Sequence, residues 1–209
     1  MNTNLFSNAF PFFRLFQKQA VTLGEAVGKL HALFLNFQDA PDLCRHIHTL
    51  AAAGETTCRE IEREHALTFI ASIDREDVRD LNRAFELTFQ AVRAVSSRIG
   101  LYDFRRVEKG AGELTLCLAE MAAEIGPQLE IVVRKGNGAA NRERLRKLRE
   151  DIGRFLLVGL GELYEAAGGS AVQPIEAIKW TQIYDRLETT ASCLEHTANV
   201  IERMILKKV

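Results

Sequence analysis

The sequence has few of the features that mark membrane-spanning, disulfide-bonded or nucleic-acid-binding proteins. Its most apolar segment, FLLVGLGELY at 155–164, is much shorter than the roughly 20 residues that a transmembrane helix needs. The four cysteines, at positions 44, 58, 117 and 193, are widely spaced and form no C-x-x-C motif, which argues against a zinc knuckle and favours reduced thiols. A net charge of −1 argues against a nucleic-acid partner. We therefore expect a cytoplasmic protein without a secretion signal.

Proline is scarce, and the period-two pattern of β-strands is missing. Of the four prolines, Pro11, Pro41 and Pro174 suit helix starts, where a missing N–H costs little. We expect Pro127 to kink or break the helix that contains it. Apolar residues recur at spacings of three and four, so the sequence predicts an all-α protein. The expected helices cover residues 12–38, 41–70, 74–100, 111–134, 141–166 and 174–207.

The apolar residues of the expected helices form narrow stripes. In the third helix the stripe runs from Val78 to Ile99 in alternating steps of three and four, and the last helix repeats this spacing. Such stripes suit antiparallel bundles with crossing angles near about 20°. The helices also divide into two sets of similar length. We therefore predict two pseudo-repeated antiparallel three-helix bundles, at 1–104 and 105–209, in one elongated body.

Shorter signals lie at the ends of these helices. Ser72 or Asp74 is expected to cap the third helix, and the glycine-rich segments 135–141 and 166–174 are interpreted as turns. Near the start of the chain, phenylalanines occupy positions 6, 10, 12, 13 and 16. They either cap the core or form an aromatic surface that docks on a partner or a bilayer.

Several glutamates directly follow stripe residues and therefore lie at the stripe edges. Glu188 and Glu195 are seven residues apart in the last helix, Glu86 is in the third, and Glu55 follows Gly54 in the second. Acids from different helices can converge on a hard cation such as Mg²⁺, Mn²⁺ or iron. Alternatively, glutamate occupies such edges because its stem covers apolar surface while its carboxylate stays in water. The missing side chain at Gly54 lets a neighbouring helix approach closely.

The chain resembles a known family in three segments: FFRLFQKQAVTLGEAVGKL at 12–30, FIASIDREDVRDL at 69–81 and WTQIYDRLETTASCLEHTANVIE at 180–202. They are similar to the PhoU-like proteins, in the branch of Pit accessory proteins, the phosphate transport regulators. The resemblance extends over nearly the whole chain. It implies the PhoU-like fold of two three-helix bundles, and a cytoplasmic protein that can lie peripherally at the inner membrane. It also implies a non-enzymatic partner of a Pit-type phosphate transporter.

The family binds metal clusters through repeated E(D)-x-x-x-D motifs, and this chain departs from them. The motif positions fall on Ala51 and Glu55, Glu86 and Gln90, Arg149 and Gly153, and Glu188 and Ser192. None of these pairs keeps both acids, and a metal cluster needs many anionic oxygens. We therefore expect no firmly bound cofactor and at most a divalent or iron ion at low occupancy. The candidate metal ligands are Glu55, Glu86, Gln90, Glu188 and Glu195.

Other charged groups have two interpretations. Arg149 is expected to pair with Glu188 where relatives hold metal. The basic run NRERLRKLREDIGR at 141–154 is either a solvated amphipathic helix or a contact for anions or phospholipids. Glu120 and Glu124, four residues apart, are either a local acid pair or, as we expect, exposed side chains. The scattered histidines are expected to lie on the surface or be partly packed. No phosphate loop, G-x-S-x-G motif or nucleophilic Cys–His arrangement is present.

These observations leave three hypotheses of function. The first is a non-enzymatic regulatory partner of a Pit-type transporter. The second is a metal-dependent all-α phosphohydrolase, which would need convergent carboxylates around Mg²⁺. The third is a helical scaffold that only oligomerises. A homo-oligomer is compatible with each of them.

Overall fold

The computed structural model describes residues 10–67, 74–102, 104, 107–168 and 174–207. These residues form six α-helices and one short 3-10 helix, with no strand among them. In chain order the elements are α1 (Phe10–Leu35), η1 (Phe37–Asp39), α2 (Ala40–Leu67), α3 (Arg75–Tyr102), α4 (Lys109–Arg134), α5 (Ala139–Gly168) and α6 (Pro174–Leu206). The all-α prediction is confirmed, and each expected helix is present with its ends shifted by a few residues.

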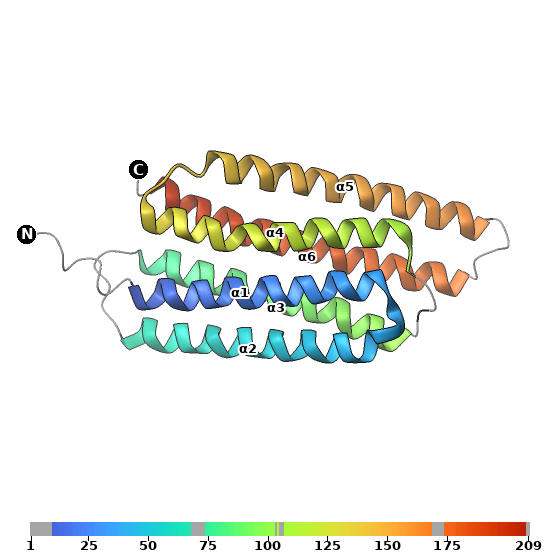
Figure 1. Ribbon diagram of the computed structural model, residues 1–209, viewed down its shortest axis with the longest axis horizontal. Coiled ribbons are helices and arrows are strands. Elements are labelled where there is room, and N and C mark those ends of the chain that lie inside the picture. The colour runs from blue at the N-terminus through green and yellow to red at the C-terminus, as the bar shows by residue number, and fades with distance from the viewer. Residues whose placement is uncertain (1–9, 68–73, 103, 105–106, 169–173, 208–209) are drawn as a thin grey trace, which may run out of the picture.

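The helices run along one long axis and form an elongated body (Figure 1). Within it, α1, α2 and α3 pack against one another, and so do α4, α5 and α6. The two sets join where α1 packs on α4 and α3 packs on α6. These joining contacts are as extensive as those inside each set. The division into separate units at 1–104 and 105–209 therefore stays a prediction.

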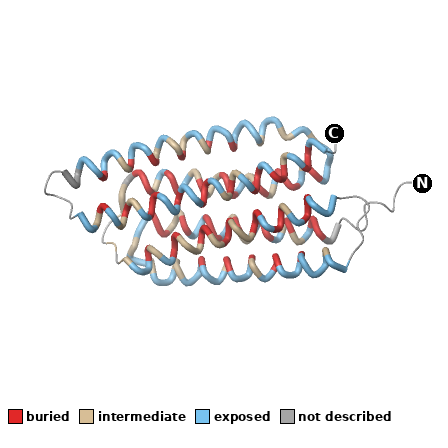
Figure 2. Tube along the Cα trace, turned by 180° about the vertical axis from the view of Figure 1, so that it is seen from behind, coloured by how far each residue is buried: buried red, intermediate tan, exposed pale blue. Residues whose placement is uncertain are grey.

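The core lies along the apolar stripes, which face the inside of the body (Figure 2). Every stripe residue from Val78 to Ile99 in α3 is buried, and so is every one from Trp180 to Ile205 in α6. Burial of such side chains contributes about 25 cal/mol for each Å² of apolar surface removed from water. The stripe spacing therefore predicted correctly which faces of these helices are buried.

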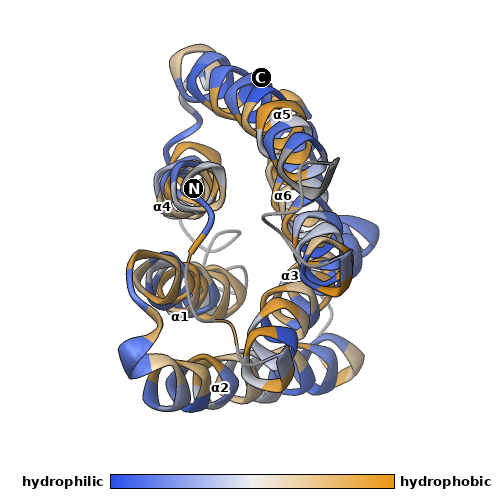
Figure 3. Ribbon diagram, turned by 90° about the vertical axis from the view of Figure 1, so that its right-hand side faces the viewer, coloured by the Kyte–Doolittle hydropathy of each residue, from blue (hydrophilic) through white to orange (hydrophobic). Residues whose placement is uncertain are grey.

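A view along the long axis shows how the helices share the core. Helices α5, α6 and α3 form one side of the cross-section, and α4 and α1 form the other (Figure 3). Helix α2 covers α1 and α3, whereas α5 covers α4 and α6. Helices α2 and α5 are thus the outer helices, and each presents a long face to solvent.

The aromatic residues at the beginning of α1 belong to the core. Phe12, Phe13 and Phe16 are buried, and the Phe16 ring stacks on Phe85 of α3 with 6.1 Å between the ring centroids. The core interpretation is therefore confirmed for these three residues. Phe6 and the side chain of Phe10 lie outside the described residues.

The ends of the helices carry the expected capping groups. Asp74 Oδ1 accepts the N–H of Glu76 at 3.0 Å and so caps α3, while Ser72 lies outside the described residues. This hydrogen bond, followed by one from Lys207, lowers the pKa of Asp74. At the end of α4, Lys135 adopts a left-handed conformation with φ of 53°, which confirms the turn before α5.

Pro127 does not break its helix. Helix α4 is continuous from Lys109 to Arg134, with Pro127 inside it, so a break is excluded and a kink stays a prediction. Contacts with α1, α5 and α6 hold α4 on several sides, and such packing overrides the local cost of proline. None of the helices in the described part of the chain is long and apolar enough to span a bilayer.

Candidate functional site

The candidate metal ligands fall into two groups on different helix pairs. The first group comprises Glu55 on α2 with Glu86 and Gln90 on α3, and the second comprises Glu188 and Glu195 on α6. In the described residues, no three histidine, cysteine, aspartate or glutamate side chains come together as metal ligands would. Each of the four glutamates instead pairs with an arginine.

Close packing of α2 on α3 positions Glu55. A Cβ atom added at Gly54 would lie only 2.3 Å from Cε2 of Phe89, so glycine at this position lets the two helices approach. The neighbouring Glu55 side chain is 20% exposed, and its Oε1 lies 2.7 Å from Nη1 of Arg93 on α3. The expectation of a close neighbour at Gly54 is confirmed. The guanidinium of Arg93 therefore already lies where a metal ion bound by Glu55 would have to lie.

Glu86 is likewise engaged within α3. It pairs with Arg83 one turn earlier, and Gln90 Nε2 donates to Glu86 Oε1 at 3.4 Å. Its side chain is 30% exposed. The carboxylate therefore has a charged partner and an amide partner, both from its own helix.

A buried thiol lies beneath the first group. Cys58 of α2 is 3% exposed, and burial raises its pKa to about 11, with smaller contributions from nearby carboxylates, Glu86 and Glu55 among them. Gln19 Nε2 donates to its Sγ at 3.0 Å. Because a metal ligand or nucleophile must be a thiolate, Cys58 is suited to packing rather than to chemistry.

In the second group one arginine joins two glutamates. Arg149 of α5 places Nε 3.0 Å from Oε2 of Glu195 and Nη2 3.7 Å from Oε1 of Glu188. The predicted pairing of Arg149 with Glu188 is confirmed. Glu195 is the nearer partner, and the sequence did not indicate it. A guanidinium thus takes the position between two carboxylates that a cation would need.

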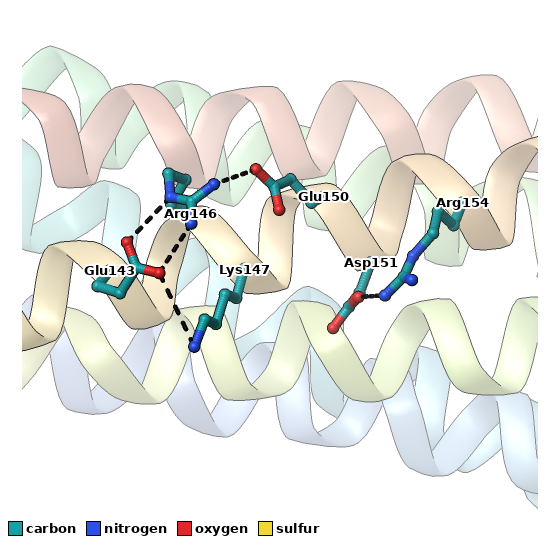
Figure 4. Close-up of polar contacts among 6 residues, drawn as sticks. All are labelled: Glu143, Arg146, Lys147, Glu150, Asp151 and Arg154. Carbon is teal, nitrogen blue, oxygen red and sulfur yellow. Dashed lines mark hydrogen bonds and ion pairs between the residues drawn. The ribbon is translucent and has the colours of Figure 1, made fainter.

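The basic residues at the beginning of α5 form ion pairs with acidic residues of the same chain. Figure 4 shows Arg146 between Glu143 and Glu150, Lys147 beside Glu143, and Arg154 paired with Asp151. A hydrogen bond from Arg146 lowers the pKa of Glu143.

The other arginines of the run pair with acids on neighbouring helices, Arg142 with Glu202 and Arg144 with Glu124. These contacts favour the solvated-helix interpretation over an anion site.

The expectation that Glu124 is exposed is wrong. Its side chain is only 18% exposed, and its carboxylate accepts one hydrogen bond from Asn141 Nδ2 at 2.7 Å and pairs with Arg144 at 2.8 Å. Glu120 lies 3.5 Å from the same arginine. Nothing in the local sequence of α4 indicates that Asn141 and Arg144, in the first turns of α5, lie beside Glu124. The scattered histidines are exposed or partly packed, as expected.

A groove of about 350 Å³ runs between α4, α5 and α6. Its floor includes Gln128, which is 2% exposed and donates from Nε2 to the carbonyl of Ala198 at 3.0 Å. Gln128 Oε1 has no hydrogen-bond partner among the described residues. Arg142, Arg149 and Glu195 also line the groove. Their ion pairs leave it without a strong excess of either charge.

Comparisons with known proteins agree with this architecture. No protein-family model matches the sequence. Over 205 residues the chain is 25% identical to a Rhizobium meliloti (strain 1021) protein named "putative pit accessory protein", with 95% of this chain and 94% of that protein covered.

Two crystal structures of PhoU-like proteins from Shewanella oneidensis MR-1 match with TM-scores of 0.82 and 0.80. Each match covers 94% of this chain and 99% of the other, at 13% and 14% identity. Identities this low show the fold alone. The chain therefore has the PhoU-like fold, and the resemblance of its sequence to the PhoU-like Pit accessory family is confirmed.

Proposed function

We propose that this protein is a non-enzymatic regulatory partner of a Pit-type inorganic phosphate transporter, acting from the cytoplasmic side of the membrane. The observation that carries the proposal is similarity along 95% of the chain to a protein named for a Pit accessory role. The PhoU-like fold, which it shares with proteins from another bacterium, is consistent with this role. An elongated helical body with two outer helices offers long faces for a partner.

The pairing of the carboxylates supports a binding role over the phosphohydrolase alternative. Metal-dependent hydrolysis of phosphate esters uses carboxylates that converge on one or two divalent ions. Here Arg93 and Arg149 lie within 4 Å of the glutamates that would have to converge. Any ion would have to displace a guanidinium, so we propose at most weak binding of a divalent or iron ion.

The function is tested by phosphate uptake in cells. In a strain whose only phosphate importer is the Pit-type transporter, deleting the gene of this protein should change the initial rate of radiolabelled phosphate uptake. The wild-type gene should restore that rate. An unchanged rate would contradict the proposal, and hydrolysis of phosphate esters by the purified protein with Mg²⁺ or Mn²⁺ would favour the alternative.

The metal content is tested separately. Elemental mass spectrometry of protein purified without chelator or affinity tag should find far less than one metal ion per chain. Near-stoichiometric iron, zinc or manganese that disappears in the Glu55→Ala and Glu86→Ala variants would contradict weak binding. It would place the family's metal chemistry between α2 and α3.

A further inference from the structure

The groove between α4, α5 and α6 continues into a second hollow at the end of the body where α5 begins and α6 ends (Figure 1). The two hollows measure about 350 and 340 Å³, and Gln128, Arg142 and Glu202 line both of them. We call the two hollows together the α5–α6 groove, because these helices form its walls and α4 forms its floor. Each hollow lies within the size range of small-molecule sites, about 300–1,000 Å³.

The floor of the α5–α6 groove holds a buried hydrogen-bond acceptor. Gln128 is 2% exposed, and its Nε2 donates to the carbonyl of Ala198. Its Oε1 has no hydrogen-bond partner among the residues that the structure describes. In an α-helix each carbonyl points toward the residue four positions later, so this amide group lies beside the turn of α6 that carries Glu202. Because a buried acceptor without a donor costs free energy, a ligand that brings an N–H or O–H group to Oε1 would remove that cost.

The two walls of the groove carry opposite charges. The lining residues of α5 include three arginines and one glutamate, and those of α6 include two glutamates: Arg142, Arg146, Arg149 and Glu150 on α5, and Glu195 and Glu202 on α6. Arg142 pairs with Glu202 across the groove, and Arg149 pairs with Glu195. These four side chains are 25–47% exposed, and partly exposed ion pairs contribute little to stability. Charged groups of a ligand can therefore join or replace these pairs at small cost.

Apolar side chains lie between the charged walls. Met121 of α4, Leu145 of α5 and Ala198 of α6 are buried and line the first hollow, and Ile205 of α6 is buried and lines the second. An apolar group of a ligand that enters the groove would leave water and contact these side chains, which favours binding.

A small zwitterion with an apolar side chain matches these three features together. Its ammonium group supplies N–H donors for Gln128 Oε1 and is attracted by the carboxylate of Glu202, whereas its carboxylate matches the planar guanidinium of Arg142. An anion such as sulfate has no donor for Oε1, and a simple cation leaves the arginines unmatched. We propose that the α5–α6 groove binds a free α-amino acid with an apolar side chain, such as leucine. This site goes beyond the proposed function and does not rest on it.

The test is isothermal titration calorimetry of the full-length protein with L-leucine, for which saturable binding is expected. Isocaproate, which lacks the amino group of leucine, and isoamylamine, which lacks its carboxylate, should bind at least about tenfold more weakly. These two analogues keep the apolar side chain, so the difference measures the recognition of both charges.

Two variants of the protein test the residues. Gln128→Met keeps the length of the side chain but removes the acceptor, and Glu202→Gln removes the charge at a partly exposed position; each should weaken leucine binding at least about tenfold. The matched control is Glu130→Gln, because Glu130 also pairs with an arginine but lies on the side of α4 that faces α1. It should bind leucine like the wild type. Thermal melts confirm that each variant is folded.

Leucine binding that is weakened in Gln128→Met and Glu202→Gln, and kept in Glu130→Gln, would support the inference. If leucine gives no heat of binding and does not raise the melting temperature, the groove holds solvent alone and the inference is wrong. It is also wrong if Gln128→Met and Glu202→Gln bind leucine like the wild type, or if isoamylamine binds as tightly as leucine. Binding of phosphoethanolamine, a zwitterion without an apolar side chain, in place of leucine would exclude an amino acid and make the site one for a lipid headgroup.

Discussion

The contact between Gly54 and Phe89 gives the sharpest prediction of stability. In a Gly54→Ala variant the new Cβ would lie 2.3, 2.4 and 2.6 Å from three atoms of the Phe89 ring. Distances this short require the ring or the helices to move. The Phe89 side chain is 0% exposed, so the ring has no free space to turn into. The variant must therefore separate α2 from α3 or strain the core.

Two opposing effects set the size of the change. Overpacking a well-filled core costs about 1–3 kcal/mol, whereas alanine stabilises a helix interior by up to about 1 kcal/mol relative to glycine. Because three ring atoms clash rather than one, we expect the upper part of the overpacking range. The free energy of unfolding should therefore fall by about 1–2 kcal/mol. Urea denaturation followed by circular dichroism measures it, with an unchanged slope showing that the transition itself is the same.

A matched glycine provides the control. A Cβ at Gly24 of α1 would have no atom within 4 Å, so Gly24→Ala should be neutral or stabilising by up to about 1 kcal/mol. Shortening the ring with Phe89→Leu should reduce the cost of Gly54→Ala, because residues in contact are energetically coupled. If Gly54→Ala proves as stable as the wild type, the close packing of α2 on α3 is wrong, and so is the position of Glu55 that follows from it.

Three further predictions follow from individual contacts. Burial lowers the pKa of His31 below its ordinary value of 6.5, so the folded state binds fewer protons than the unfolded chain in mildly acidic solution. The free energy of unfolding should then fall as the pH drops through 6.5, and His31→Asn should flatten this slope in urea titrations at several pH values; an identical slope would contradict it. Cys58, with its pKa raised to about 11 by burial, should react with Ellman's reagent only when the protein opens; in a variant with serine at the three partly exposed cysteines, Cys44, Cys117 and Cys193, fast labelling of the native protein would exclude this. Arg149→Met keeps the aliphatic stem but frees Glu188 and Glu195; it should cost no more than about 1 kcal/mol, because the pairs are partly exposed, and high salt should reduce the difference.

The sequence predicted the helices well because their signals are local. Spacings of three and four from Val78 to Ile99 define a face without any knowledge of neighbours. The cap at Asp74 and the turn after Arg134 depend on a few adjacent residues. The pairing of Arg149 with Glu188 was also predicted, since both occupy the positions where the family keeps acids.

Contacts between helices were harder to predict, because they depend on the rotation and the axial shift of each helix. Glu55 and Arg93 are 38 positions apart, and only the close approach at Gly54 brings them together. Glu124 was predicted to be exposed, because the sequence around it does not reveal a hydrogen-bond donor on another helix. Gln128, at the floor of the groove, gave no signal in the sequence, since glutamine is usually exposed.

The central position of α6 has a consequence for how the chain acquires its fold. Helix α6 follows all the others in the sequence, yet it packs against α3, α4 and α5. During synthesis on the ribosome, the apolar faces of α3 and α4 that pack on α6 stay uncovered until α6 has been made. Nascent chains with exposed apolar faces are prone to aggregate and are bound by chaperones. Shortening the chain before Pro174 would thus remove the helix that covers the apolar faces of α3 and α4.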